Sequence, residues 1–188
     1  MKNNDKYFMK LAIKEAKKAG NDVLPNPKVG CLIVKDGKVV SKGFHKRFGG
    51  RHAEKVAIDN LPQNITKATM YVTLEPCAHK GKTNPCIDLI YPSIINRVVI
   101  SSLDPNPSAS GGINALLNKK ISVTKNVCTL KSKKINQRFF TYHEKKRPYI
   151  IIKAALTLDG FIAESNGVSK WITNKKSRQS VHFLRSSC

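Results

Sequence analysis

Three potential metal ligands lie far apart along this chain of 188 residues, and its fold must bring them together if they act as one site. His52 is followed by Cys77 and, nine residues later, by Cys86. One imidazole and two thiols are typical of a catalytic zinc site, which keeps a fourth position open for water. The sequence therefore predicts that His52, Cys77 and Cys86 converge on one Zn²⁺ ion. A structural zinc site and a chance cluster are the alternatives.

A carboxylate stands two residues after the histidine, in the segment His52-Ala53-Glu54. In the zinc deaminases of nucleobases, one His and two Cys hold the metal, and a Glu that is not a ligand moves protons. Glu54 could take a proton from an activated water and deliver it to a ring nitrogen and to the departing amine. The pattern indicates hydrolytic deamination of a ring carbon, with Glu54 as the catalytic residue.

The spacing of the two thiols distinguishes among deaminases. Cytidine and tRNA-adenosine deaminases generally carry Pro-Cys-x-x-Cys, whereas eight residues separate Cys77 from Cys86 here. This insert contains His79, Lys80 and Lys82. We expect it to contact a phosphate or a polar ring edge above the metal, and a solvated loop is the alternative.

Hydrophobic periodicity and turn residues predict strands that alternate with helices, which indicates an α/β fold. We expect a layered domain with the ligands just beyond strand ends, where open α/β sheets bind substrates. Asp5 could cap the first helix, and Asp36-Gly37 predicts a hairpin turn. The predicted helices cover residues 5–19, a segment from about 52, 85–95, 112–118 and 130–140; the predicted strands cover 29–34, 39–44, 69–74, 97–101 and 121–124.

A lysine-rich stretch at residues 143–148 predicts a domain boundary. We expect a first domain over residues 1–146 and a second, incomplete one over residues 147–188. Residues 149–156 predict an apolar strand, which would be an aggregation hazard unless it were covered or paired.

The chain is strongly basic, with 34 Lys and Arg against 12 Asp and Glu and a net charge of +22. Such a charge can indicate nucleic acid, a phosphorylated substrate or a solvated surface. The lysines are dispersed and few aromatics lie among them, so we expect no nucleic-acid partner. Apolar runs stay short of the ~18 residues that span a bilayer, so no membrane association is expected. The start MKNNDKYFMK lacks a secretory pattern, which with five cysteines favours a cytoplasmic location.

The chain resembles the bifunctional riboflavin-biosynthesis deaminase–reductases, the RibD/RibG family of bacteria. The resemblance covers nearly the whole sequence, and the thiol loop is its most specific part. The matching deaminase stretches are 25–31, 43–45, 50–54, 77–86 and 104–107, and those that match the start of the reductase domain are 147–149, 153–155, 158–160 and 169–173.

The resemblance implies a three-layer cytidine-deaminase-like fold, with a mixed central sheet flanked by helices. It also implies deamination of 2,5-diamino-6-ribosylamino-4(3H)-pyrimidinone 5′-phosphate to 5-amino-6-(5-phosphoribosylamino)uracil. By motif position, His52, Cys77 and Cys86 hold zinc, and Glu54 relays protons. The implied substrate contacts are Asn26, His45, His79, Lys82, Asp104 and Asn106. Asn26 and Asn106 could instead shape turns, and His45 could be an ordinary strand-end residue. Asn84 departs from the family, which usually has a second proline there.

The family's reductase domain uses NADPH to reduce the ribose of the deaminated product. Ala155 and Trp171 match its cofactor-binding positions, and Ser169 and Arg185 match its substrate positions. About forty residues rarely bury enough surface to fold alone. We therefore expect no reductase activity from this chain alone, and NADPH as a cofactor only of a complete domain.

Two other functions stay open from the sequence: a base deaminase acting on RNA, and an inactive remnant that serves as a partner of an intact reductase. A homo-oligomer and a separate reductase that completes the pathway are further partners to consider. The small phosphorylated pyrimidine is the substrate that we expect.

Overall fold

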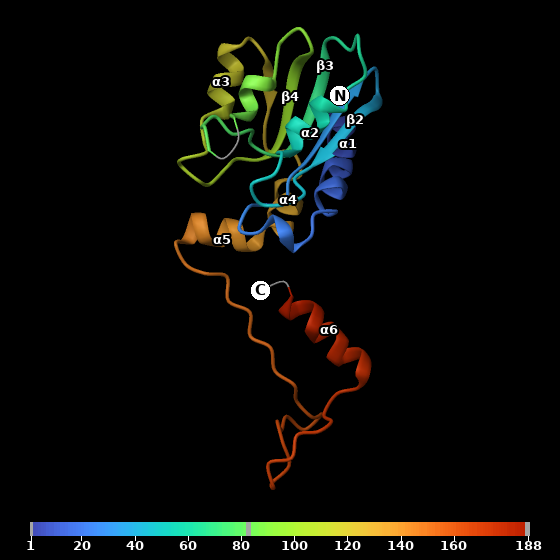
Figure 1. Cartoon of the computed structure of the whole chain (residues 1–188), viewed down its shortest axis with the longest axis vertical. Helices are drawn as coiled ribbons and strands as arrows, with labels where there is room; N and C mark the ends of the chain where they lie inside the picture. Colours follow the sequence, from blue (N-terminus) through green and yellow to red (C-terminus); the bar gives the residue numbers. More distant parts are fainter. Residues whose placement is uncertain (1, 82–83, 187–188) are drawn as a thin grey trace. The chain divides into compact units, whose positions relative to one another are not determined.

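The computed structural model describes residues 2–81 and 84–186. The chain forms two compact units, Met1–Pro148 and Tyr149–Cys188, which are described separately. Figure 1 traces the elements of both units in chain order. Among the described residues, no helix is both long enough and apolar enough to cross a bilayer.

A mixed five-stranded sheet forms the centre of the first unit (Figure 1). Its order is β2-β1-β3-β4-β5; β1 pairs antiparallel with both β2 and β3, whereas β3, β4 and β5 run parallel. The turn at Asp36 and Gly37 has positive φ at both residues, as the tight hairpin predicted there requires. The strands are β1 Gly30–Lys35, β2 Lys38–Phe44, β3 Ala68–Leu74, β4 Ile95–Ser102 and β5 Ser122–Thr124.

Helices cover both faces of the sheet, because side chains alternate along each strand. Ile33 and Met70 belong to a core cluster that includes α2 and α3, whereas Leu32 and Tyr71 belong to a second cluster with α1. The prediction of an α/β fold with a mixed sheet flanked by helices is confirmed. The helices of this unit are α1 Lys2–Ala16, η1 Asn21–Val23, α2 Ala53–Asp59, η2 Cys86–Leu89, α3 Gly112–Asn118, α4 Thr129–Ile135 and α5 Gln137–Lys145.

The predicted cap of the first helix is wrong. The helix α1 begins at Lys2, and Asp5 lies within its first turn. The carboxylate of Asp5 is buried against the sheet, where it pairs with Arg97 at 2.6 Å and accepts a hydrogen bond from Tyr71 at 2.8 Å. The carboxylate of Asp5 therefore bonds to Arg97 and Tyr71 of the sheet and does not cap the helix.

Two other predicted helices differ from the structure. Residues 85–95 form only the short 3₁₀ helix η2, since Pro92 has no N–H and disfavours a helical conformation at Tyr91. The helix predicted over 130–140 is divided into α4 and α5 at Asn136, whose side chain bonds to the backbone of Lys28.

The second unit contains the helix α6 Lys175–Arg185. The strand predicted at 149–156 is wrong, because those residues carry no strand and Ile150 and Ile152 are 68% and 90% exposed. None of the described side chains of this unit is classed as buried. These residues therefore build no hydrophobic core of their own.

Candidate active site

The three predicted metal ligands meet beside the carboxyl end of β3. His52 directly precedes α2, Cys77 follows β3, and Cys86 begins η2. The Nδ1 atom of His52 lies 3.2 Å from Sγ of Cys86 and 3.6 Å from Sγ of Cys77, and the three ligand atoms lie within 4.8 Å of one another. Tetrahedral zinc with ordinary bond lengths places N and S ligands about 3.6 Å apart. The donor set and its spacing therefore fit a zinc ion.

The two thiols shift each other's pKa in opposite directions. The hydrogen bond with Cys86, assisted by His52 and opposed by burial, lowers the pKa of Cys77 to about 4. The same contact, together with burial, raises the pKa of Cys86. The backbone N–H of Cys86 also donates to Sγ of Cys77 at 3.3 Å. A bound divalent cation would favour the thiolate form of both side chains.

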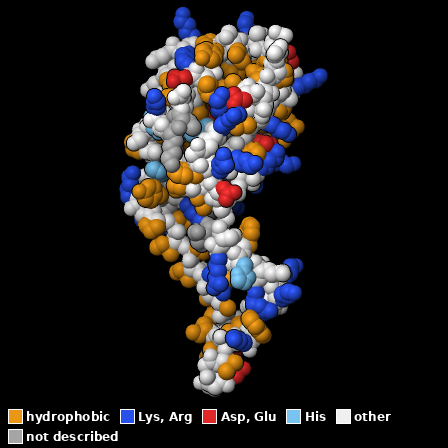
Figure 2. All heavy atoms as spheres, in the orientation of Figure 1, with side chains coloured by type: hydrophobic (Ala, Val, Ile, Leu, Met, Phe, Trp, Pro, Cys, Tyr) orange, Lys and Arg blue, Asp and Glu red, His pale blue; other side chains and the backbone are white. Residues whose placement is uncertain are grey.

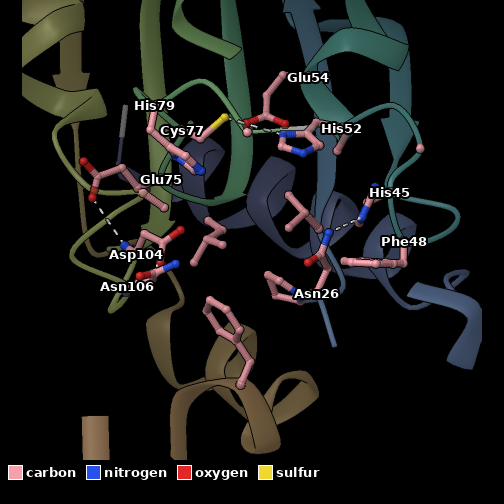
Figure 3. A pocket seen from close by; sticks show the side chains of 18 of the residues that line it. Asn26, His45, Phe48, His52, Glu54, Glu75, Cys77, His79, Asp104 and Asn106 are labelled. Carbon is pink, nitrogen blue, oxygen red and sulfur yellow. Dashed lines mark hydrogen bonds between the residues drawn. The ribbon is translucent and has the colours of Figure 1, made fainter. Parts of the chain in front are cut away.

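Glu54 lies in the first turn of α2, with its side chain buried beside the ligand cluster. Figure 3 shows its carboxylate next to the His52 ring and the Cys77 sulfur. Burial raises the pKa of Glu54 to about 7, although the nearby His52 opposes the shift. A carboxyl group that titrates near neutral pH can both accept and donate protons under physiological conditions.

A cavity of about 240 Å³ opens over this cluster. Asn26, His45 and Phe48 lie on one side of it, and His79, Asp104 and Asn106 lie on the other (Figure 3). His52, Glu54 and Cys77 also line the cavity. The structure thus brings five of the six predicted substrate contacts around one cavity with Glu54. The sixth, Lys82, lies outside the described residues.

Hydrogen bonds fix the orientation of the His45 ring. Its Nδ1 lies 3.0 Å from the carbonyl oxygen of Arg51, which can only accept, so Nδ1 carries the hydrogen. Nε2 then accepts a hydrogen bond from the amide nitrogen of Asn26 at 3.1 Å. Burial also lowers the pKa of His45, which favours the neutral ring. The amide of Asn26 is therefore oriented with its nitrogen on His45, leaving its oxygen as the acceptor.

A buried carboxylate that the sequence did not single out, Glu75, holds the backbone on the side of the cavity formed by His79, Asp104 and Asn106. Glu75 accepts hydrogen bonds from the backbone N–H groups of Asp104 at 3.3 Å and Ile113 at 3.1 Å. Asp104 in turn accepts from the backbone N–H of Asn106 at 2.8 Å. Burial raises the pKa of Asp104 to about 6, and the nearby Glu75 adds to the shift.

Two aromatic side chains in the cavity wall were also missed. Phe48 comes from the loop after β2, and Phe139 comes from α5. Glu75 could have been found, because it stands between a buried strand and the Pro76-Cys77 pair. Phe139 lies 53 residues beyond Cys86 and carries no local signal of its position.

The four residues matched to the family's reductase lie in the second unit. Ser169 and Trp171 share a cleft there with Asp159 and Phe161. The guanidinium of Arg178 stacks 4.1 Å from the Trp171 ring centre. Ala155 and Arg185 are not among the described residues that line this cleft. The four positions are therefore not gathered into one site.

Comparison with known proteins agrees with the fold and the ligand geometry. Residues 2–102 match the family described as the cytidine and deoxycytidylate deaminase zinc-binding region. The chain therefore belongs to this family of zinc-binding deaminases, and the cytidine-deaminase-like fold expected from the sequence is confirmed. Residues 148–188 match the RibD C-terminal domain.

The chain is also similar to individual proteins that carry the name RibD or the description deaminase/reductase. The riboflavin biosynthesis protein RibD of Aquifex aeolicus is 49% identical over 96% of this chain and 51% of its own. The structure of Acinetobacter baumannii RibD superposes with a TM-score of 0.94 at 40% identity, covering 100% of this chain and 53% of the other. A deaminase/reductase of Thermotoga maritima gives 0.90 at 47% identity, covering 98% and 53%. The chain spans about half the length of the curated relatives that it matches.

Proposed function

We propose that this protein deaminates 2,5-diamino-6-ribosylamino-4(3H)-pyrimidinone 5′-phosphate to 5-amino-6-(5-phosphoribosylamino)uracil, a step of riboflavin biosynthesis. The observation that carries the proposal is the convergence of the ligand atoms of His52, Cys77 and Cys86 beside a cavity that is lined by the buried side chain of Glu54. The Thermotoga relative is described as a diaminohydroxyphosphoribosylaminopyrimidine deaminase, which supports this choice of substrate.

The residues of the site would have two separate roles, metal binding and proton transfer. His52, Cys77 and Cys86 would hold Zn²⁺. When bound, this ion would lower the pKa of a water molecule toward about 7, so that the water loses a proton readily near neutral pH. Glu54 accepts a proton of the attacking water at a carboxylate oxygen and transfers it to a ring nitrogen of the substrate. It then accepts the remaining proton of the oxygen that has added to the ring carbon and delivers it to the departing amine, which leaves as ammonia. Because Glu54 gives away each proton that it accepts, it is a carboxylate again at the end of each turnover.

The remaining side chains of the cavity would hold the pyrimidine. The oxygen of Asn26 can accept a hydrogen bond from a ring N–H or an amino group, since its nitrogen is engaged by His45. Asp104, Asn106 and His79 offer polar atoms from the opposite side. We assign Lys82 to the substrate phosphate on its motif position alone.

An RNA-base deaminase is the weaker alternative. The loop from Cys77 to Cys86 is longer than in the tRNA-adenosine enzymes, and Lys and Arg side chains occur in many places over the face shown in Figure 2. An inactive remnant is also disfavoured, because every predicted deaminase side chain among the described residues lines the cavity or joins the ligand cluster.

The second part of the proposal concerns domains and partners. We assign residues 1–146 to the deaminase domain and residues 147–188 to the start of a reductase domain, in which Ala155, Trp171, Ser169 and Arg185 would serve NADPH and substrate only when the domain is complete. A separate reductase, a homo-oligomer and a cytoplasmic location stay predictions.

The direct test is ammonia release by purified, zinc-loaded protein supplied with the diaminopyrimidine phosphate. Glu54→Gln should keep the zinc and lower kcat by about a thousandfold, the size of effect expected for a lost general acid–base. His52→Ala should lose both zinc and activity. Glu144→Gln, which removes an exposed carboxylate paired with Lys133, is the matched control and should behave as wild type. Unchanged turnover in Glu54→Gln would contradict the role given to Glu54.

A further inference from the structure

One face of α4 carries three polar side chains, each of which bonds to the backbone of a different segment. Thr129, Ser132 and Asn136 are spaced three and four residues apart, so they share a face of the helix and its end. The hydroxyl of Thr129 donates to the carbonyl of Ser101 at 2.7 Å, at the end of β4. The hydroxyl of Ser132 donates to the carbonyl of Thr73 at 2.7 Å, at the end of β3.

Asn136 makes the most specific of these contacts. Its Oδ1 accepts a hydrogen bond from the backbone N–H of Lys28 at 2.7 Å, and its Nδ2 donates to the backbone carbonyl of Lys28 at 2.9 Å. The residue is only 6% exposed. Both polar groups of one amide thus engage both polar groups of one peptide residue, much as a neighbouring β-strand would.

The segments held by α4 are those that supply the cavity. β3 leads to Glu75 and Cys77, β4 leads to Asp104 and Asn106, and Lys28 lies two residues after Asn26. Asn136 also stands where α4 ends and α5 begins, three residues before Phe139 of the cavity wall. A single side chain therefore connects the Asn26 loop to the helix that carries Phe139.

We propose that Asn136 is a positioning residue for substrate binding, which fixes the Asn26 loop against α5 and so sets the distance between two walls of the cavity. The inference rests on the proposed function for its kinetic consequence. It concerns the wall that binds the pyrimidine and leaves the ligand cluster and Glu54 untouched.

The kinetic test compares two variants of Asn136. Asn136→Ala removes both bonds to Lys28, and Asn136→Asp keeps the acceptor but places a second anionic oxygen against the Lys28 carbonyl. Both should raise KM about tenfold, with kcat within about twofold of wild type and the zinc content unchanged. Lys134→Ala, an exposed position of α4 two residues before Asn136, is the control and should leave KM unchanged. A fall in kcat with KM unchanged would overturn the proposal.

A measurement on the wild-type protein tests the contact without any variant. The amide hydrogen of Lys28 should exchange slowly with solvent, and Asn136→Asp should still protect it more than Asn136→Ala does. Rapid exchange of this hydrogen in the wild type would overturn the proposal even if neither variant folds. If the wild type releases no ammonia, the proposed function fails. Slow exchange of the Lys28 amide hydrogen would still support the proposal that Asn136 holds the Asn26 loop.

Discussion

Two carboxyl groups of the cavity, those of Glu54 and Asp104, have pKa values well above those of ordinary Glu and Asp side chains. Burial raises the pKa of Glu54 to about 7 and that of Asp104 to about 6. Removing a carboxyl group from water, fully for Glu54 and partly for Asp104, costs stability, because the charged form is poorly solvated there. Their presence beside the ligand cluster is typical of a site at which protons are exchanged.

The raised pKa of Asp104 predicts how stability depends on pH. Its carboxyl group binds a proton more tightly in the folded state (about 6) than in the unfolded state (about 3.9), so its contribution to stability falls as pH rises between these values. Asp104→Asn should therefore raise the unfolding temperature above pH 6, and the gain should disappear near pH 4. The oxygen of Asn can still accept from the Asn106 N–H.

Thermal unfolding of both proteins, followed at several pH values from about 4 to about 8, checks this prediction. A gain of the same size at every pH would show that the charge of Asp104 does not cause it.

The sequence predicted those site residues that are marked by their immediate neighbours in the chain. His52 and Glu54 stand two positions apart, and a cysteine directly after a strand end is readily recognised. The roles of Glu75 and Asn136 depend on backbone groups 29 and 108 residues away, at Asp104 and Lys28. Periodicity carries no information about such contacts, so the partners of these two side chains could not be predicted, although the position of Glu75 between a strand and Pro76-Cys77 marks it as a candidate site residue.

At the level of elements, α1 is joined to the sheet by one polar network. Asp5 pairs with Arg97 and accepts from Tyr71. Burial alone would raise the pKa of Asp5, but the hydrogen bonds from Arg97 and Tyr71 outweigh it and lower that pKa. The network also raises the pKa of Tyr71 to about 12, with burial as the largest cause.

This network predicts a stability that is lost in acid. A carboxyl group with a lowered folded-state pKa stabilises the protein above its unfolded value of about 3.9, and the contribution disappears as pH falls through the folded value. Asp5→Asn should lower the free energy of unfolding by about 2 kcal/mol at pH 7, with the deficit shrinking below about pH 4. Asp59→Asn, which breaks more exposed pairs with Lys55 and Arg51, should cost about 0.5 kcal/mol. Equal losses in the two variants would contradict the prediction.

The same helix lies so close to β1 that only glycine fits between them. A Cβ at Gly30 would collide with the backbone of Ala12 and Ala16, whereas one at Gly20 would meet open space. Gly30→Ala should therefore lower the free energy of unfolding by about 2 kcal/mol or more, and Gly20→Ala should leave it nearly unchanged. Chemical denaturation of both variants measures the difference, and a fully stable Gly30→Ala protein would show that α1 can move away.

The strands could be predicted more reliably than the helices. Short apolar runs bounded by turn residues located all five strands to within two residues. The helix predicted over 85–95 overlooked Pro92, and the division at Asn136 depends on a tertiary contact. The sequence could not indicate the order of the strands, because pairing β1 with β3 joins segments about 40 residues apart.

For the molecule as a whole, the ligand cluster joins three segments that are distant in the sequence. An ion that binds the folded state and not the unfolded one shifts the unfolding equilibrium by mass action. Chelation of zinc should therefore lower the unfolding temperature of the first unit by about 10 °C. Cys86→Ser should unfold at the low temperature with or without metal, whereas Cys128→Ser should respond to chelation as wild type does. A chelator without effect on the wild type would contradict the ligand assignment.

The large excess of lysine and arginine has a consequence for how the cavity is reached. A net charge of +22 surrounds the protein with a positive potential that attracts anions from solution. A phosphorylated small molecule would then be drawn in by diffusion faster than a neutral one, and dissolved ions would weaken that attraction. Ionic strength should thus slow the capture of such a molecule while leaving later events inside the cavity unaltered.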